Sequence, residues 1–294
     1  MKTTRWLKLI FLLAISFALQ VVFHEVWNFF FFKEKPNIVI DNRGEFFDPS
    51  LMRLSSVSKF VDYCDSVYGN KKINSNDSDY YAGIVSQTLK GRFYHGYSYY
   101  RLGQNFLAHL FAPFLNKNLS AIVLPDDILK HPNAACSQQS LIGMEVFRKK
   151  GFSVRKIGFF NKNYGGHFCF ETFYNGKWHF FDPDLEPEIH TLAKLGRPGI
   201  ADLVQRGPRL LNALYSKNKR NYVQDALTTY TYGTPNKFPA PNARIYQYAT
   251  KYLSYTLWFW LILLYFFVRN RFSLIHKTKT CAELQGSLVP ETKM

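Results

Sequence analysis

The sequence has few cysteines, and they share no recurring spacing. The four are Cys64, Cys136, Cys169 and Cys281, and none of them forms a CxxC pair. This excludes a disulfide scaffold and gives no recognisable metal-ligand pattern. Glycine and proline, at 17 and 13 residues, are too few for a low-complexity chain, and no internal repeat is present.

The usual signatures of nucleic-acid binding are also missing, although the net charge is +16. No zinc-ligand set, RNP-like motif or basic helix with heptads occurs, so we expect no nucleic-acid partner. A basic chain can also attract an anionic membrane or an acidic polysaccharide. The simplest interpretation is a solvated basic surface, with an acidic polysaccharide as a possible ligand.

What the chain does have is apolar and aromatic content. Its 294 residues are 47% hydrophobic and 18% aromatic. That length and composition predict one sizeable packed domain with additional segments, or two small domains, and not a disordered chain.

Two long apolar runs lie near the ends of the chain. Lys2, Arg5 and Lys8 precede the first, Leu9–Phe23, and no small-x-small cleavage site follows it. A cleaved signal peptide is the rival interpretation, but the missing site favours an uncleaved transmembrane signal anchor over residues 1–32.

The second run, residues 252–268, contains no charged residue and is rich in Tyr and Trp, as membrane spans are at the interface. A basic tail, residues 269–294, follows it. Because Lys and Arg flank the outer ends of both runs, the positive-inside rule places both termini in the cytoplasm and residues 33–251 outside the cell membrane.

Between the runs we expect one α+β domain over residues 33–200 and a helical connector over residues 201–251. Asn133 can cap a helix that runs roughly over 134–150, with Cys136 in its first turn. Strand patterns follow this helix, and helices precede it, which is the order expected of an α+β fold.

The stretch GGHFCFETFYNGKWHFFDPD, residues 165–184, predicts a β-hairpin that turns at Asn175–Gly176. The two-residue turn fixes the register and places Cys169 opposite Asp182. His167 is then the diagonal neighbour of Asp182, about 7–8 Å away between backbones, which a long side chain can cross. The register therefore predicts a hydrogen bond between this imidazole and this carboxylate.

The predicted pair of His167 and Asp182 could activate a thiol nucleophile. A histidine held by a carboxylate can take the proton of a thiol, and a helix N-terminus favours the thiolate. Cys136, His167 and Asp182 are therefore the candidate catalytic residues. A purely structural His–Asp pair is the alternative. Cys169 is a rival nucleophile without a helix terminus to activate it. Glu171 is expected to be an exposed strand residue, and the alternative is a hydrogen-bond acceptor that supports the site residues.

These motifs together resemble the core of the transglutaminase-like superfamily over about 50 residues, 134–184. The matching pattern is a Cys that opens a helix, G-x-x-x-R, GH-x-x-x-E and G-x-W-x-x-x-DP. In this sequence it falls on Cys136, Gly151, Arg155, His167, Glu171, Trp178, Asp182 and Pro183.

The resemblance implies a papain-like core in which the Cys-bearing helix packs on an antiparallel sheet, and a Cys-His-Asp triad that needs no metal or cofactor. It implies acyl transfer through a thioester on a peptide or protein substrate, by hydrolysis, deamidation or cross-linking. It also implies an oxyanion hole of the Cys136 backbone N–H and an upstream side chain, for which Gln104, Gln138 and Gln139 are candidates.

Two other functions fit the same sequence. Some members of this superfamily have lost catalysis, so the domain could be a non-catalytic binding module. It could also be an accessory protein of the cell envelope, in which a basic outer face holds an acidic polysaccharide during surface polysaccharide assembly.

Overall fold

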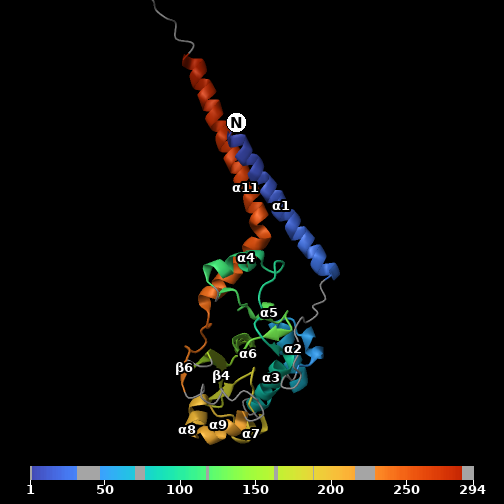
Figure 1. The fold of residues 1–294 in the computed structure, drawn as a ribbon, viewed down its shortest axis with the longest axis vertical. Helices are drawn as coiled ribbons and strands as arrows, with labels where there is room; N and C mark the ends of the chain where they lie inside the picture. Colours follow the sequence, from blue (N-terminus) through green and yellow to red (C-terminus); the bar gives the residue numbers. More distant parts are fainter. Residues whose placement is uncertain are drawn as a thin grey trace, which may run out of the picture. The chain divides into compact units, whose positions relative to one another are not determined.

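The computed structural model describes residues 2–31, 47–69, 77–116, 119–161, 165–187, 189–215 and 229–286 (Figure 1). The chain divides into two compact units. The first contains residues 1–33, 103–107 and 249–294, and the second contains residues 34–102 and 108–248. Parts of the predicted connector and tail, 216–228 and 287–294, lie outside the described residues.

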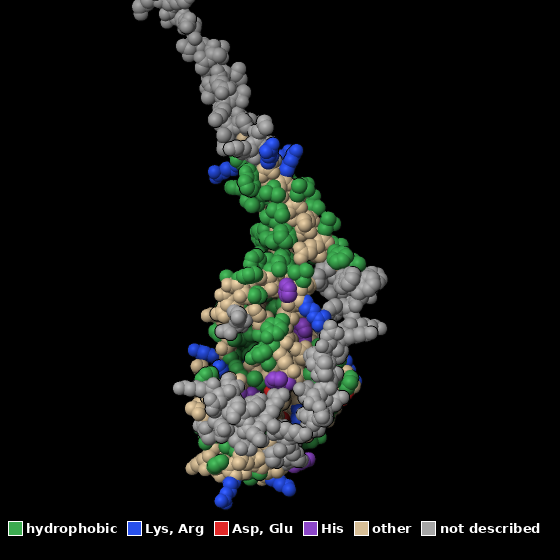
Figure 2. Space-filling view, in the orientation of Figure 1, with side chains coloured by type: hydrophobic (Ala, Val, Ile, Leu, Met, Phe, Trp, Pro, Cys, Tyr) green, Lys and Arg blue, Asp and Glu red, His purple; other side chains and the backbone are tan. Residues whose placement is uncertain are grey.

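The first unit contains α1 (Lys2–Phe31) and most of α11 (Pro241–Gly286). Phe11 of α1 contacts Tyr265 of α11, with ring centroids 5.3 Å apart. The stretches Arg5–Phe23 and Pro241–Phe272 are long and apolar enough to cross a membrane, and only 6% of each is buried. Figure 2 shows this apolar surface, with Lys and Arg side chains at one end of it.

The second unit mixes helices with a sheet, as the sequence predicts. Its elements in chain order are η1 (Pro49–Arg53), α2 (Val57–Tyr68), α3 (Ser78–Arg92), β1 (Tyr94–His95), α4 (Phe106–Leu115, whose first turn belongs to the first unit), α5 (Pro125–Ile128), β2 (Asn133–Ala134), α6 (Cys136–Lys149), β3 (Ser153–Asn161), β4 (Gly165–Tyr174), β5 (Lys177–Phe181), α7 (Ile189–Lys194), α8 (Ile200–Gln205), α9 (Pro208–Tyr215) and β6 (Tyr230–Tyr232).

The main sheet has four antiparallel strands in the order β5-β4-β3-β6. The hairpin register is confirmed: β4 and β5 pair from Phe170 opposite Phe181 to Tyr174 opposite Lys177. The turn residues Asn175 and Gly176 both have positive φ, 48° and 76°, as a tight two-residue hairpin turn requires. β6 comes from the segment predicted as a connector and adds an edge strand.

Helices cover both faces of this sheet. Successive residues of a strand point to opposite faces, so neighbours in β4 enter different cores. Phe170 packs with the helices α2, α3 and α6, whereas Cys169 packs with α8 and α9. The sheet is therefore the middle of three layers, and the polar groups on its Cys169 face are enclosed by protein.

The start of α6 differs from the prediction by two residues. Asn133 does not cap the helix, because Asn133 and Ala134 form β2, which pairs in parallel with β1. The Asn133 amide instead donates to the carbonyls of Gly96 and Tyr97, at 3.3 and 2.9 Å. The helix thus begins at Cys136.

Close packing of α6 on the sheet gives a stability prediction. A Cβ at Gly143 would lie 2.6 Å from the ring of Phe170, whereas a Cβ at Gly83 of α3 would meet nothing within 4 Å. We expect Gly143→Ala to destabilise the fold by about 1–3 kcal/mol through overpacking. Gly83→Ala should stabilise it by about 0.5–1 kcal/mol through helix propensity. Melting temperatures that move in the same direction for both would contradict this packing.

Candidate active site

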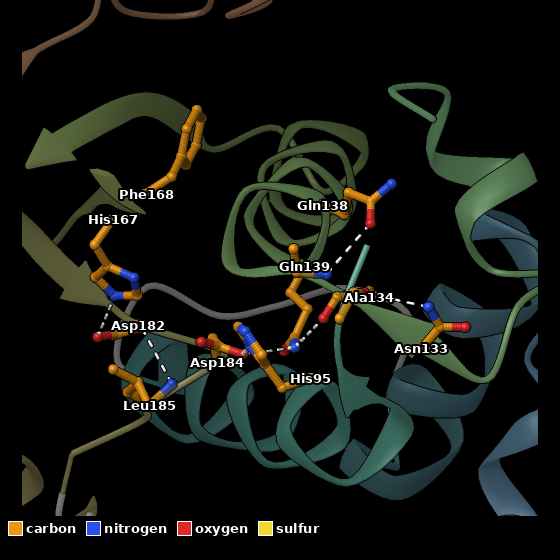
Figure 3. A network of polar contacts seen from close by, with 12 residues as sticks. His95, Asn133, Ala134, Gln138, Gln139, His167, Phe168, Asp182, Asp184 and Leu185 are labelled. Carbon is orange, nitrogen blue, oxygen red and sulfur yellow. Dashed lines mark hydrogen bonds and ion pairs between the residues drawn. The ribbon is translucent and has the colours of Figure 1, made fainter. Parts of the chain in front are cut away.

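The histidine of β4 is bound to the carboxylate that follows β5. His167 Nε2 lies 2.9 Å from Asp182 Oδ2, as the hairpin register predicts (Figure 3). Asp182 is fully buried, and it also accepts hydrogen bonds from the Tyr215 hydroxyl at 3.1 Å and the Leu185 N–H at 3.2 Å. The Asp182 carboxylate thus accepts all three of these hydrogen bonds.

The two groups shift each other's protonation. Burial by itself lowers the pKa of His167, but the charge of Asp182 and the hydrogen bonds that His167 forms with Asp182 and Cys136 outweigh it, so the pKa lies well above its ordinary value. Burial would raise the pKa of Asp182, but His167, Leu185 and Tyr215 reverse this, and the net shift is downward. The arrangement therefore favours an imidazolium–carboxylate pair.

The third predicted residue lies next to this pair. Cys136 is the first residue of α6, is 9% exposed and forms a hydrogen bond with His167. Because Asp182 engages Nε2, Nδ1 is the ring nitrogen left to take a proton from a thiol. The helix N-terminus at Cys136 also favours negative charge there. The structure thus brings together the three residues; their catalytic role remains a prediction.

A second thiol borders the same imidazole. Cys169 is fully buried, and burial, followed by the charge of Asp182, raises the pKa of its thiol well above the ordinary value. It is therefore held as a thiol and not as the reactive thiolate.

His167, Cys169 and Asp182 also carry metal-ligand atoms within 4.8 Å of one another. Imidazole, thiolate and carboxylate would suit zinc. The donor set fits poorly, however, because the Asp182 oxygens already accept three hydrogen bonds and Cys169 is held protonated.

Two of the three predicted oxyanion-hole side chains, Gln138 and Gln139, form structural hydrogen bonds instead. Gln138 uses its amide protons on the carbonyls of Ser98 and Ile122, at 3.0 and 2.8 Å. The Gln139 amide nitrogen donates to Ala134 O and to Asp184, at 2.9 and 3.2 Å. These two buried amides hold neighbouring segments against α6. Because their protons are already donated to these acceptors, neither amide is placed to stabilise an oxyanion. Gln104 belongs to the other unit.

Tyr97 is a candidate donor that the sequence patterns did not reveal. Its side chain is half exposed and hydrogen-bonds the side chain of Ser137, the residue after Cys136. Burial and the neighbouring Cys136 both raise the pKa of the phenol, which keeps its proton available for donation. A phenolic O–H beside a helix N-terminus is a suitable second oxyanion donor.

Glu171 is buried, contrary to the prediction of an exposed strand residue. Its carboxylate accepts from Arg155 Nε at 2.7 Å and Nη2 at 2.6 Å and from the Ile200 N–H at 2.7 Å. The Arg155 guanidinium lies over the rings of Trp178 and Tyr232, at 4.2 and 3.8 Å. Three of the motif residues thus join four strands and α8 instead of forming the site.

A second buried ion pair holds the Asp182 segment in place. Glu186 accepts from the Asp182 N–H at 3.2 Å and pairs with Arg197 at 2.7 Å. The Arg197 guanidinium also lies 4.5 Å from the centre of the Phe181 ring. The carboxylate that orients His167 is therefore fixed from its own backbone as well as through its side-chain contacts.

A second imidazole–carboxylate pair was also missed by the sequence analysis. His95 Nδ1 lies 2.6 Å from Asp184 Oδ1, and Gln139 bonds the same oxygen. The sequence separates His95 from Asp184 by 89 positions, so no local pattern could reveal the contact.

Comparison with known proteins gives little beyond this geometry. No family model and no curated protein matches the sequence. The chain is similar to a solved structure described as "Crystal structure of a TGase", with a TM-score of 0.30 and 14% identity. The similarity covers 50% of this chain and 34% of that one, so it spans about one third of that protein's length.

Proposed function

We propose that this chain is a membrane-anchored, transglutaminase-like cysteine enzyme that transfers acyl groups through a thioester. The observation that carries the proposal is the chain of contacts from Cys136 at a helix start to His167 and on to the buried Asp182. The thiol, the base and the group that orients the base come from α6, β4 and the turn after β5, so the fold itself assembles them.

The chemistry follows from those positions. His167 takes the thiol proton at Nδ1 while Asp182 stabilises the imidazolium at Nε2. The Cys136 thiolate attacks the carbonyl carbon of a carboxamide or peptide bond and forms a tetrahedral oxyanion, stabilised by the Cys136 backbone N–H and by Tyr97. Collapse of this intermediate breaks the C–N bond, and His167 returns the proton to the departing ammonia or amine. Water or a second amine then resolves the thioester.

The membrane arrangement is part of the proposal. The helices α1 and α11 each cross the bilayer, both termini lie in the cytoplasm, and the second unit acts outside on peptides or proteins. The contact of Phe11 with Tyr265 supports this arrangement, because it places the basic start of α1 beside the basic residues Arg269 and Arg271 of α11.

The first test is the reactivity of Cys136. In the detergent-solubilised chain, iodoacetamide should alkylate Cys136 at pH 6 about tenfold or more faster than in the His167→Ala variant, because the imidazolium stabilises the thiolate. Peptide mass spectrometry separates Cys136 from the other thiols, and Cys136→Ser gives the background. An alkylation rate of Cys136 at pH 6 that is the same in the wild type and in His167→Ala, or no alkylation before denaturation, would instead support the non-catalytic binding module.

A further inference from the structure

The pair formed by His95 and Asp184 joins an exposed imidazole to a buried carboxylate. Asp184 is almost fully buried, with 3% of its side chain exposed, whereas 38% of the His95 side chain is exposed. A carboxylate can only accept, so the His95 nitrogen that bonds it, Nδ1, carries the proton. In the neutral ring this leaves the lone pair on Nε2, for which no bonded partner is seen among the described residues.

Three contacts place this pair beside the start of α6. His95 pairs with Ala134 in the parallel β1–β2 ladder, and Ala134 lies two residues before Cys136. Gln139, in the first turn of α6, bonds both Ala134 O and Asp184. Figure 3 shows Asp184 between the imidazoles of His167 and His95, with Asp182 below His167. One short turn therefore supplies a carboxylate to a buried histidine and another to an exposed one.

The chain next to His95 also exposes aromatic surface. Tyr97 and Tyr99 are 50% and 51% exposed, and their ring centroids lie 6.0 Å apart. The same segment is fastened to β2 through the Asn133 amide, which bonds the Gly96 and Tyr97 carbonyls. Exposed phenol rings attract ammonium groups through cation–π contacts of about 0.5–1 kcal/mol each. A primary ammonium is thus the kind of ligand that this wall would bind.

We propose that His95, oriented by Asp184, is the base that prepares a primary amine to resolve the thioester on Cys136. This inference rests on the proposed function and makes the chain a transferase toward alkylamines, not only a hydrolase. His95 Nε2 removes one proton from the bound alkylammonium and becomes an imidazolium paired with Asp184. The neutral amine attacks the thioester carbon, and the second proton that the amine loses passes to Nδ1 of His167, which became neutral when the leaving group departed. The C–S bond breaks, and the thiolate of Cys136 is regenerated beside the His167 imidazolium. The proton on His95 passes to solvent.

The need for such a base follows from the acceptor. A lysine-like amine has a pKa of about 10.4, so at neutral pH nearly all of it is protonated and cannot attack. His167, which is neutral once the leaving group has departed, can take only one of the two protons that an alkylammonium loses when it becomes an amide. A second imidazole that is open to solvent removes this limitation.

The test separates acylation from resolution. The full chain in detergent is given p-nitrophenyl acetate, and nitrophenolate release reports acylation of Cys136. Two acceptors are compared: n-butylamine, which is protonated at neutral pH, and hydroxylamine, which is largely neutral there. The variant His95→Asn keeps a donor where Nδ1 stood but removes the base, and Asp184→Asn removes the orienting charge. His190→Asn, on the exposed side of α7, is the matched control.

We expect both site variants to be acylated within about twofold of the wild-type rate, because Cys136 and His167 are intact. Their transfer to n-butylamine should fall about 10²-fold or more, the range of general-base catalysis, and transfer to hydroxylamine should fall much less. Equal losses with both amines, or unchanged transfer to n-butylamine, overturns the inference and leaves the proposed function standing. Absence of Cys136-dependent acylation in the wild type overturns both.

Discussion

Asp182→Asn is expected to slow acylation of Cys136 by about 10²- to 10⁴-fold while the protein stays folded. The Asp182 side-chain contacts described above all come from donors: His167 Nε2, the Tyr215 hydroxyl and the Leu185 N–H. An asparagine must turn its NH₂ group toward Leu185 or toward His167. The first choice leaves two donors facing each other, and the second forces the His167 proton onto Nδ1, the nitrogen that must receive the thiol proton.

The same substitution removes the charge that supports the imidazolium. Without Asp182, burial is the dominant influence on His167, and its pKa should fall below the ordinary value. The measurement is nitrophenolate release at pH 7 beside Asp202→Asn, an exposed aspartate of α8 that should change nothing. An Asp182→Asn variant as fast as wild type would show that the pair is structural.

The pH dependence of stability checks the same pair independently. The lowered pKa of Asp182 stabilises the fold above about pH 3.8, and this contribution is lost as the pH falls through the folded-state pKa. The raised pKa of His167 stabilises the fold below about pH 6.5, and this contribution is lost as the pH rises through the folded-state pKa. The melting-temperature gap between wild type and Asp182→Asn should therefore be largest between about pH 4 and pH 6.5.

Local sequence patterns predicted the hairpin well because its register depends on one turn. Positive φ at Asn175 and Gly176 leaves little freedom, and the pairing of His167 with Asp182 follows from residue parity. The start of α6 was predicted within two residues from a cap signal, which locates a helix end only approximately. The same limit explains the error at Asn133, whose pairing with a strand about 40 residues earlier leaves no local signal.

Contacts between distant segments explain the other errors. Glu171 looked solvent-exposed because strand alternation says nothing about what covers a sheet face, and the covering helix α8 begins 29 residues later. The pairing of His95 with Asp184 depends on the same kind of long-range contact. Gln138 and Gln139 were plausible oxyanion donors by position alone. Only their carbonyl partners show that their amide protons are already used.

Glu171→Ala should give the largest loss of stability, about 3–5 kcal/mol, because it leaves a charged partner without its counter-ion. The Glu171 side chain is fully buried, and 18% of the Arg155 side chain is exposed. The substitution also removes the acceptor of the Ile200 N–H. The partly exposed pair of Glu145 and Arg148 on α6 is the matched control. Glu145→Ala should cost no more than about 1 kcal/mol, because solvent screens that pair.

The consequence for activity separates a structural role from a catalytic one. Glu171 joins β4 to Arg155 on β3 and to the start of α8, but its hydrogen-bond partners do not include Cys136, His167 or Asp182. The folded fraction of Glu171→Ala, measured by urea titration in detergent, should therefore keep a rate of Cys136 acylation within about threefold of wild type. A loss that exceeds the loss of folded protein would place Glu171 in the catalytic machinery. Glu171→Gln, which keeps one oxygen for the Ile200 N–H, should recover part of the stability without recovering the ion pair, because a neutral amide leaves the Arg155 charge uncompensated.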